Sequence, residues 1–280
     1  MELTYSRGAT IQIGNRDFDK LFMGAKDDVP KEKAKEHYKF MKEFVDKELE
    51  DSATAIRNDL IIKQLKDKCR IRHKDGKPYV SVTSVNAFAD GFPDFPPGYD
   101  ARGTIVHAYM ERWALEGVKG RFNMKDLMKD FPELMPEFAR AAEYEINILD
   151  CRADAVIEKL EGLNIEFLHM EKDVYNDTLF YSGQADVIGK IDGEWAIIDY
   201  KTGQSWDKPK MRKYFKQLAA YANTDTVKEI TGGEPITKLV IIPLDTKLVK
   251  PKPLIINDKV KEHFAMFKET RRKFKDTYKI

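Results

Sequence analysis

Residues 182–201, SGQADVIGKIDGEWAIIDYK, decide the fold. Asp192-Gly193 is a strong signal for a two-residue hairpin turn, and β-prone residues flank it on both sides. We therefore predict two antiparallel strands joined by this turn. The turn also sets the register, because Ile191 then pairs with Glu194 and each further pair lies one residue outward on both strands.

This register brings two carboxylates together. Asp186 and Asp199 each lie five residues outward from the pair at the turn, so they should face each other with Cβ atoms about 5 Å apart. Like charges in that arrangement are destabilising unless a cation neutralises them. Two Asp side chains suit Mg²⁺ or Mn²⁺. The register therefore predicts a metal site.

Lys201 lies two residues after Asp199 and shares its face of the strand. Its ammonium could orient or help deprotonate a water, or stabilise charge on a pentavalent phosphate. The alternative is a solvent-facing hairpin with scattered charges, which is plausible for any one of these residues. It is less plausible for all three, because AIIDYK (196–201) is an apolar strand with its charges at one end.

The bulk properties indicate a globular chain. Its 280 residues suit one large domain or one domain with an appendage, and 42% hydrophobic residues suffice for a core. The net charge is only +1, but residues 247–280 carry 11 Lys and Arg against 4 Asp and Glu. Such a basic segment suits a polyanion, although a solvated helix face explains it equally well.

Several cofactors and locations are excluded or disfavoured. Cys69 and Cys151 lack CxxC spacing, which excludes a four-cysteine iron–sulfur cluster or zinc finger within the chain. Residues 183–190, GQADVIGK, depart from the phosphate-binding loop pattern, so no bound nucleotide is expected. Without a long apolar run or a signal-like start, we expect a cytoplasmic protein with no membrane contact.

The chain divides by pattern into two regions. Residues 1–77 combine a strand or hairpin at 3–14 with a charged helical stretch at 30–68, and residues 78–280 hold the rest. A turn precedes a β-prone segment within 74–85, and 90–103 is a Pro/Gly-rich connector. The elements expected after it are a helix at 103–117, a helical insertion at about 120–162, a strand at 165–175, the hairpin, a helix at 208–230, a strand at 237–245 and a helix at 258–278. Without the insertion, this α-β-β-β-α-β order predicts an α/β (α+β) fold with a mixed central sheet flanked by helices.

Two polar pairs have helical spacing. His107 and Glu111 lie on one helix face, and Gln217 and Tyr221 lie on another, although either pair alone could be ordinary packing. The residues that precede Gln217 are basic and aromatic, which suits phosphates and unpaired bases, or equally a solvated helix start. Those we assign to DNA binding are Lys208, Lys210, Arg212, Lys213 and Trp206.

Taken together, these motifs resemble the RecB-like branch of the PD-(D/E)XK nuclease superfamily, which includes CRISPR-associated exonucleases. The matching stretches are RGTIVHAYMERW (102–113), EKDVYNDTLFYSGQAD (171–186), AIIDYKTG (196–203) and QLAAY (217–221), within about residues 78–245. The resemblance implies a restriction-endonuclease-like core. Many CRISPR-associated relatives carry an iron–sulfur cluster, but this chain lacks the cysteines for one.

The resemblance also implies roles for individual residues. His107, Asp186 and Asp199 would bind Mg²⁺ or Mn²⁺ together with the Tyr200 carbonyl, and Lys201 would be the catalytic lysine. Gln217 and Tyr221 would hold the substrate strand beside the site. Glu111 and Glu171 are secondary candidates for the metal.

The function implied is a metal-dependent DNA nuclease. We expect an exonuclease that acts on DNA ends or single-stranded DNA in replication, recombination or repair. One alternative is a non-enzymatic DNA-binding scaffold subunit, although all three of Asp186, Asp199 and Lys201 are present. Another is a nuclease module that works with a helicase or within a recombination or replication complex, with residues 1–77 as the docking piece.

Overall fold

The computed structural model describes residues 2–13, 16–28, 30, 33–65, 68–93, 97–117, 120–202, 206–244 and 254–278. The chain forms two compact units, which we consider separately. The first comprises Met1–Ile71 with Arg272–Ile280, and the second comprises Arg72–Arg271.

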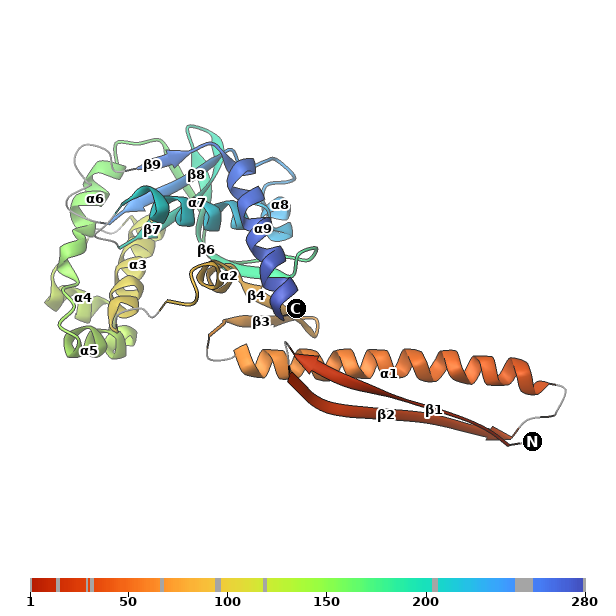
Figure 1. Cartoon of the computed structure of the whole chain (residues 1–280). Coiled ribbons are helices and arrows are strands. Elements are labelled where there is room, and N and C mark those ends of the chain that lie inside the picture. The colour runs from red at the N-terminus through yellow and green to blue at the C-terminus, as the bar shows by residue number, and fades with distance from the viewer. Residues whose placement is uncertain are drawn as a thin grey trace. The chain divides into compact units, whose positions relative to one another are not determined.

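The first unit is built on a long hairpin and a long helix. Strands β1 (Glu2–Ile13) and β2 (Arg16–Asp28) pair antiparallel, and helix α1 (Ala34–Leu65) runs alongside them (Figure 1). The residues of α1 that become buried recur every four positions, which gives the helix one apolar face. Among the α1 residues whose burial the structure describes, they are Met41, Val45, Leu49 and Ala53, followed three turns later by Leu65. The predicted strand or hairpin and the charged helix are therefore both present.

The second unit is organised around a seven-stranded mixed sheet. Its strands are β3 (Ile71–Lys74), β4 (Lys77–Ser81), β5 (Ile165–Asn176), β6 (Tyr181–Ile191), β7 (Glu194–Lys201), β8 (Lys238–Pro243) and β9 (Ile255–Asn257). Their order is β3-β4-β6-β7-β8-β9. Strands β4 and β7 pair with the two ends of one edge of β6, and β5 pairs along its other edge. Pairing is antiparallel between β6 and β7 and parallel between β7 and β8.

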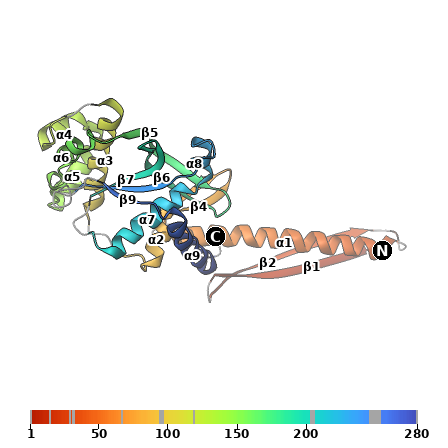
Figure 2. The ribbon, with the colours of Figure 1, turned by 90° about the horizontal axis from the view of Figure 1, so that it is seen from above.

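Helices cover both faces of this sheet. One group packs on the face that carries Val187, Ile198 and Tyr200; its members are α3 (Tyr99–Glu116), α4 (Met124–Asp130), α5 (Met135–Glu143) and α6 (Ala153–Leu160), with short 3₁₀ turns at Pro132–Leu134 and Leu149–Cys151. The other face is covered by α2 (Val82–Ala89), α7 (Lys208–Ala222) and the first part of α9 (Val260–Tyr278). The two groups lie on different sides of the strands (Figure 2). The predicted fold class is confirmed.

The predicted hairpin register is also confirmed. Pairing runs from Ile191 and Glu194 at the turn to Val187 and Ile198. Asp192 and Gly193 both have positive φ angles, 53° and 79°, as a type I′ turn requires. The ladder ends one residue before Asp186 and Asp199, so the two strands diverge where the acids stand.

Three local expectations were wrong or incomplete. The β-prone segment ends at Ser81, whose hydroxyl accepts the Ser84 amide and caps α2. The single helix expected at 208–230 divides into α7 and α8 (Asp225–Ile230), because Thr224 caps the second helix through the Val227 amide. Strand β9 was not predicted, since three residues carry too little periodicity.

Substitution of Phe267 tests the packing of α9 on the sheet. Its ring is fully buried and meets the Tyr181 ring edge-on, with centroids 4.9 Å apart. We expect Phe267→Ala to lower the free energy of unfolding by about 3–5 kcal/mol, measured by chemical denaturation. Phe264→Ala, one turn earlier and only partly buried, should cost clearly less. Equal losses would contradict this packing.

Candidate active site

The candidate site lies where β6 and β7 diverge. Asp186 is 8% exposed and Asp199 is 1% exposed. Beyond the last pair of β6 and β7, Asp186 Oδ2 accepts a hydrogen bond from the Tyr200 amide at 2.9 Å. This contact fixes the Asp186 carboxylate against β7 and beside Asp199.

Asp199 and Lys201 form a buried ion pair. Lys201 Nζ lies 2.5 Å from Asp199 Oδ2 and over the Tyr214 ring, 5.2 Å from its centroid. Burial raises the pKa of Asp199 to about 6, with Lys201 opposing the shift and Asp186 adding to it. Burial alone lowers the pKa of Lys201, but the two carboxylates outweigh it and raise that pKa well above its usual value. Lys201 therefore remains an ammonium.

His107 and Glu171 complete a cluster around Asp186. His107 Nδ1 lies 3.4 Å from Asp186 Oδ2 and 3.9 Å from Glu171 Oε1, while its Nε2 lies 3.0 Å from the Tyr200 carbonyl oxygen. Ligand atoms of His107, Glu171 and Asp186 all lie within 4.8 Å of one another. The structure thus brings together a helix residue, two strand acids and a backbone carbonyl.

Glu171 owes its position to β5. Met170 pairs with Val187 and Lys172 with Ala185, so Glu171 stands opposite Asp186. Its φ of 45° is unusual within a strand. Burial, then the charge of Asp186, raises its pKa to about 8. This placement depends on a register shift earlier in β5, between Phe167 and His169, which the sequence pattern does not reveal.

Gln217 and Tyr221 face the same region from α7. Gln217 Nε2 donates to the Tyr221 hydroxyl at 2.9 Å. The Tyr221 ring packs against Gly183, where an added Cβ would lie only 2.2 Å from ring atom Cε1. Burial raises the pKa of Tyr221, and Asp199 adds to that shift while Lys201 opposes it. The Tyr221 hydroxyl is therefore close enough to Asp199 and Lys201 to feel both charges.

Other predicted residues lie outside the three-residue cluster. Glu111 is one turn beyond His107 and adds its negative charge to the surroundings of Glu171. At the start of α7, Lys210 lies over the Tyr214 ring at 5.9 Å, and the Trp206 and Tyr214 rings are 6.3 Å apart. Lys213 is 2.5 Å from Asp90, so its charge is compensated within the protein.

Sequence reasoning passed over two arginines. Arg72 Nη1 donates to the Gly183 carbonyl at 2.6 Å, and Arg102 Nη2 donates to the Thr202 carbonyl at 3.2 Å. Arg102 belongs to the RGTIVH stretch that was singled out for its histidine, so its neighbourhood gave a signal. The sequence gives no comparable signal for Arg72, because it meets Gly183 only when distant segments of the chain pack together.

Comparison with known proteins agrees with this geometry. A family model for the PD-(D/E)XK nuclease superfamily matches residues 86–276, which is more than half of the chain. The chain belongs to the PD-(D/E)XK nuclease superfamily. A search of curated proteins gave no significant match. The matched span includes every candidate site residue, and membership indicates a metal-dependent nuclease.

The nuclease has donor atoms that fit a divalent metal ion. Besides the cluster of His107, Glu171 and Asp186, Asp199 Oδ1 is buried and has no hydrogen-bond partner among the residues that the structure describes. A buried carboxylate oxygen left in that state is costly, and a cation would satisfy it. Carboxylate, carbonyl and imidazole donors are those that Mg²⁺ and Mn²⁺ accept.

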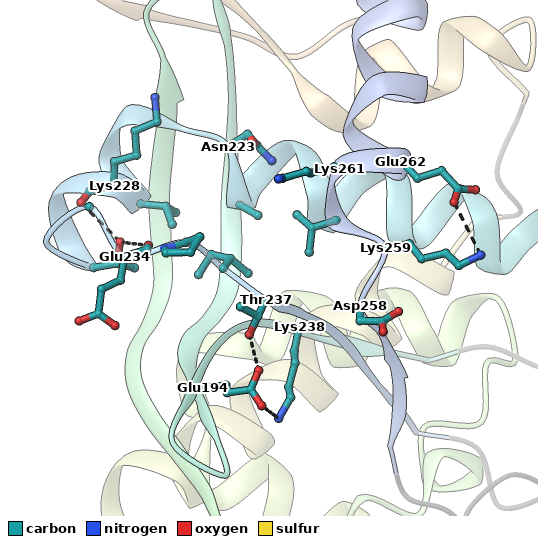
Figure 3. A pocket seen from close by; sticks show the side chains of 17 residues that line it. Glu194, Asn223, Lys228, Glu234, Thr237, Lys238, Asp258, Lys259, Lys261 and Glu262 are labelled. Atoms are coloured by element: carbon teal, nitrogen blue, oxygen red, sulfur yellow. Dashed lines mark hydrogen bonds and ion pairs between the residues drawn. The ribbon is translucent and has the colours of Figure 1, made fainter.

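A second cleft, of about 980 Å³, lies at the opposite ends of the same strands. Glu194 begins β7 and Lys238 begins β8. Their side chains form an ion pair at 3.0 Å that lines one wall of this cleft (Figure 3). Lys259 pairs with Glu262 at 3.7 Å on another wall. Because its charges compensate one another and the carboxylate cluster lies elsewhere, this cleft is not the nuclease site.

Crossing a membrane would require a long apolar helix, and none occurs in the parts of the chain that the structure describes.

The raised pKa of Glu171 predicts a pH dependence of stability in the metal-free nuclease. The folded state holds the proton more tightly than the unfolded chain, so this contribution is fully present below about pH 4.5 and is lost as pH rises through about 8. We expect the melting temperature in EDTA to fall over this window less in Glu171→Gln than in the wild type. Glu166→Gln, exposed on the same strand, should follow the wild type. Identical slopes for all three proteins would disprove the assignment.

Proposed function

We propose that the protein is a Mg²⁺- or Mn²⁺-dependent deoxyribonuclease that hydrolyses phosphodiester bonds at DNA ends or in single-stranded DNA. The observation that carries the proposal is the buried Asp199–Lys201 pair beside Asp186, with one Asp199 oxygen that no other described residue hydrogen-bonds. Superfamily membership supports the reaction class. The assignment to the RecB-like branch rests on the added His107 and Gln217–Tyr221 motifs.

A bound divalent cation would supply Lewis acidity and stabilise negative charge on the reacting phosphate. The residues that would hold it are Asp186, Asp199, His107 and the Tyr200 carbonyl, with Glu171 as a further carboxylate. Asp186 is kept in place by the Tyr200 amide, which preorganises its carboxylate.

Lys201 has two roles in this proposal. Its ammonium hydrogen-bonds the attacking water and aligns it with the phosphorus, and it stabilises the negative charge that develops on the phosphoryl oxygens. Both roles need a protonated lysine at neutral pH, which the neighbouring carboxylates favour. The Tyr214 ring beneath the ammonium adds a cation–π contact that limits its motion.

The start of α7 supports the choice of DNA as substrate. Basic side chains there neutralise phosphates, and aromatic rings offer stacking surfaces for unpaired bases. The side chains assigned to this surface are Lys208, Lys210, Arg212, Lys213 and Trp206, although Lys213 must exchange its Asp90 partner for a phosphate. Gln217 and Tyr221 continue the surface toward the acids and hold the strand that is cut.

An enzyme of this kind serves DNA replication, recombination or repair, and the long α1 of the first unit offers a surface for a partner such as a helicase. Phe40 and Phe44 on that helix stack at 6.4 Å and are 63% and 51% exposed. Deletion of residues 1–71 with unchanged association, solubility and activity would contradict a docking role.

Lys201→Ala tests the enzymatic assignment. We expect the cleavage rate of labelled DNA to fall on the order of 10²–10³-fold, because charge stabilisation and water alignment are lost together. Lys190→Ala is the matched control, since that ammonium lies over Trp195 near the hairpin turn, and it should cleave normally. Linear and circular DNA, single- and double-stranded, with Mg²⁺, Mn²⁺ or EDTA, would define the substrate.

The same experiment separates an enzyme from a scaffold. Identical products from the wild type and Lys201→Ala would sink the assignment. Calorimetric titration with Mn²⁺ should show a site that Asp186→Asn weakens. A titration in which the two proteins behave alike would favour a non-enzymatic DNA-binding subunit.

Trp206→Ala tests the stacking surface. We expect it to weaken binding of single-stranded DNA by about 1–3 kcal/mol, with less effect on blunt duplex, because unpaired bases are needed for stacking. Anisotropy with a labelled oligonucleotide in EDTA measures this without cleavage. Tyr144→Ala removes a more exposed ring after α5 and should have no effect. Equal losses on both DNA forms would argue against stacking.

A further inference from the structure

Arg102, in the first turns of α3, is a buried cation. The residue is only 4% exposed, and its buried Nε has no hydrogen-bond partner within the described part of the chain. Nη2 donates to the Thr202 carbonyl at 3.2 Å, and the guanidinium carbon lies over the Tyr99 ring at 4.8 Å. Across the described ranges, no carboxylate lies within ion-pair distance of it.

Two other arginines of the second unit have more hydrogen-bond or ion-pair partners than Arg102 has. Arg112, further along the same helix, pairs with Glu116 at 3.2 Å and Asp130 at 3.4 Å. Arg271 is also buried, but it donates to the carbonyls of Leu179 and Phe180. Among the described residues, Arg102 donates to one carbonyl oxygen, that of Thr202. A buried guanidinium that is so poorly compensated destabilises the fold unless an anion completes its surroundings.

The position of Arg102 relates it to the reaction centre. His107 contacts the Tyr200 carbonyl and Arg102 the Thr202 carbonyl, so α3 contacts the backbone on either side of Lys201, in β7 and just after its end. Alternate residues of a strand lie about 6.6 Å apart. That interval resembles the separation of neighbouring phosphates along a DNA strand. A strand with one phosphate at the acids would place the next near Arg102.

The helix end adds to this preference for an anion. The N-cap of α3 is Gly98, which supplies no side-chain acceptor, so the first amides and the positive end of the helix dipole are not capped by a side chain. Asp100 lies in the same turn, but its charge is compensated by Arg140 at 2.5 Å. The helix lies beside Thr202 here, since a Cβ built at Gly103 would be in ordinary contact with the Thr202 hydroxyl oxygen, at 3.9 Å.

We propose that Arg102 binds the DNA backbone phosphate adjacent to the scissile one, so that α3 sets which linkage of the strand enters the acid cluster. This inference rests on the proposed DNase function. The guanidinium fork offers parallel N–H groups to two phosphate oxygens, a geometry that lysine cannot reproduce. Its stacking on Tyr99 holds it in place beforehand, which lowers the entropic cost of binding.

The test is a scan with single-stranded oligonucleotides that each carry one neutral methylphosphonate linkage. Binding is measured in EDTA, and the cleaved linkage is mapped separately with Mn²⁺. In the wild type, the neutral linkage next to the mapped cleavage position should weaken binding about tenfold, as expected for a charged hydrogen bond. In Arg102→Gln, the unmodified strand should bind about tenfold more weakly, and that same linkage should cause no further loss.

Arg112→Gln is the matched control, because it removes an arginine of the same helix whose charge is already paired; it should keep the wild-type pattern. Arg102→Lys retains the charge without the fork and should restore part of the phosphate effect. If Arg102→Gln does not fold, judged by circular dichroism, comparison of Arg102→Lys with the wild type still measures the loss of the fork.

A neutral linkage that costs the same in wild type and Arg102 variants at every position overturns the proposal. An effect of Arg102→Gln confined to the difference between 5′-phosphate and 5′-hydroxyl ends also overturns it, since the phosphate would then be terminal. A wild type that cleaves no DNA with either metal is a separate result, because it refutes the DNase function itself.

Discussion

The nuclease site depends on the buried ion pair between Asp199 and Lys201. Both groups come from one strand, two residues apart, so the pair forms wherever β7 forms. Burial makes each charge costly alone, and each charge makes the other tolerable. Across the described segments, the pair leaves one Asp199 oxygen without a partner, and that oxygen is the atom that a metal ion would engage.

The two carboxylates beside this ion pair repel each other. Asp186 and Glu171 stand on neighbouring strands, and burial and mutual repulsion hold the pKa of Glu171 far above its usual range. The repulsion between these carboxylates can therefore be relieved in two ways. Protonation of Glu171 relieves the repulsion at low pH, and a divalent cation would relieve it at neutral pH. The affinity for metal should accordingly be coupled to pH, because the two relieve the same repulsion.

Much of this arrangement could be predicted from the sequence where local rules operate. The Asp192-Gly193 turn fixed the pairing of β6 and β7, and so the proximity of Asp186 and Asp199, before any family was considered. The helix and strand order of the core followed from periodicity. The α7–α8 break could have been inferred from Thr224, a capping residue that was overlooked within a long helical pattern.

What the sequence could not supply depends on contacts between distant segments. The approach of Glu171 to Asp186 needs the register shift in β5, and the contact of Arg72 with Gly183 joins residues 111 positions apart. The loss of strand pairing at Asp186 was also hidden, since the turn rule specifies how a ladder begins but not where it ends. These features arise from the competition of β4, β5 and β7 for the edges of β6.

The contact between Gly183 and Tyr221 has a consequence for the evolution of this enzyme. The ring occupies the space that any side chain at position 183 would need. The two positions are therefore not free to vary one at a time: a larger residue on β6 requires a smaller one on α7, and that exchange would also remove the hydroxyl that Gln217 binds. Among homologous chains, a change at either position should accompany a change at the other, and the pair should mark lineages that hold their substrate strand differently.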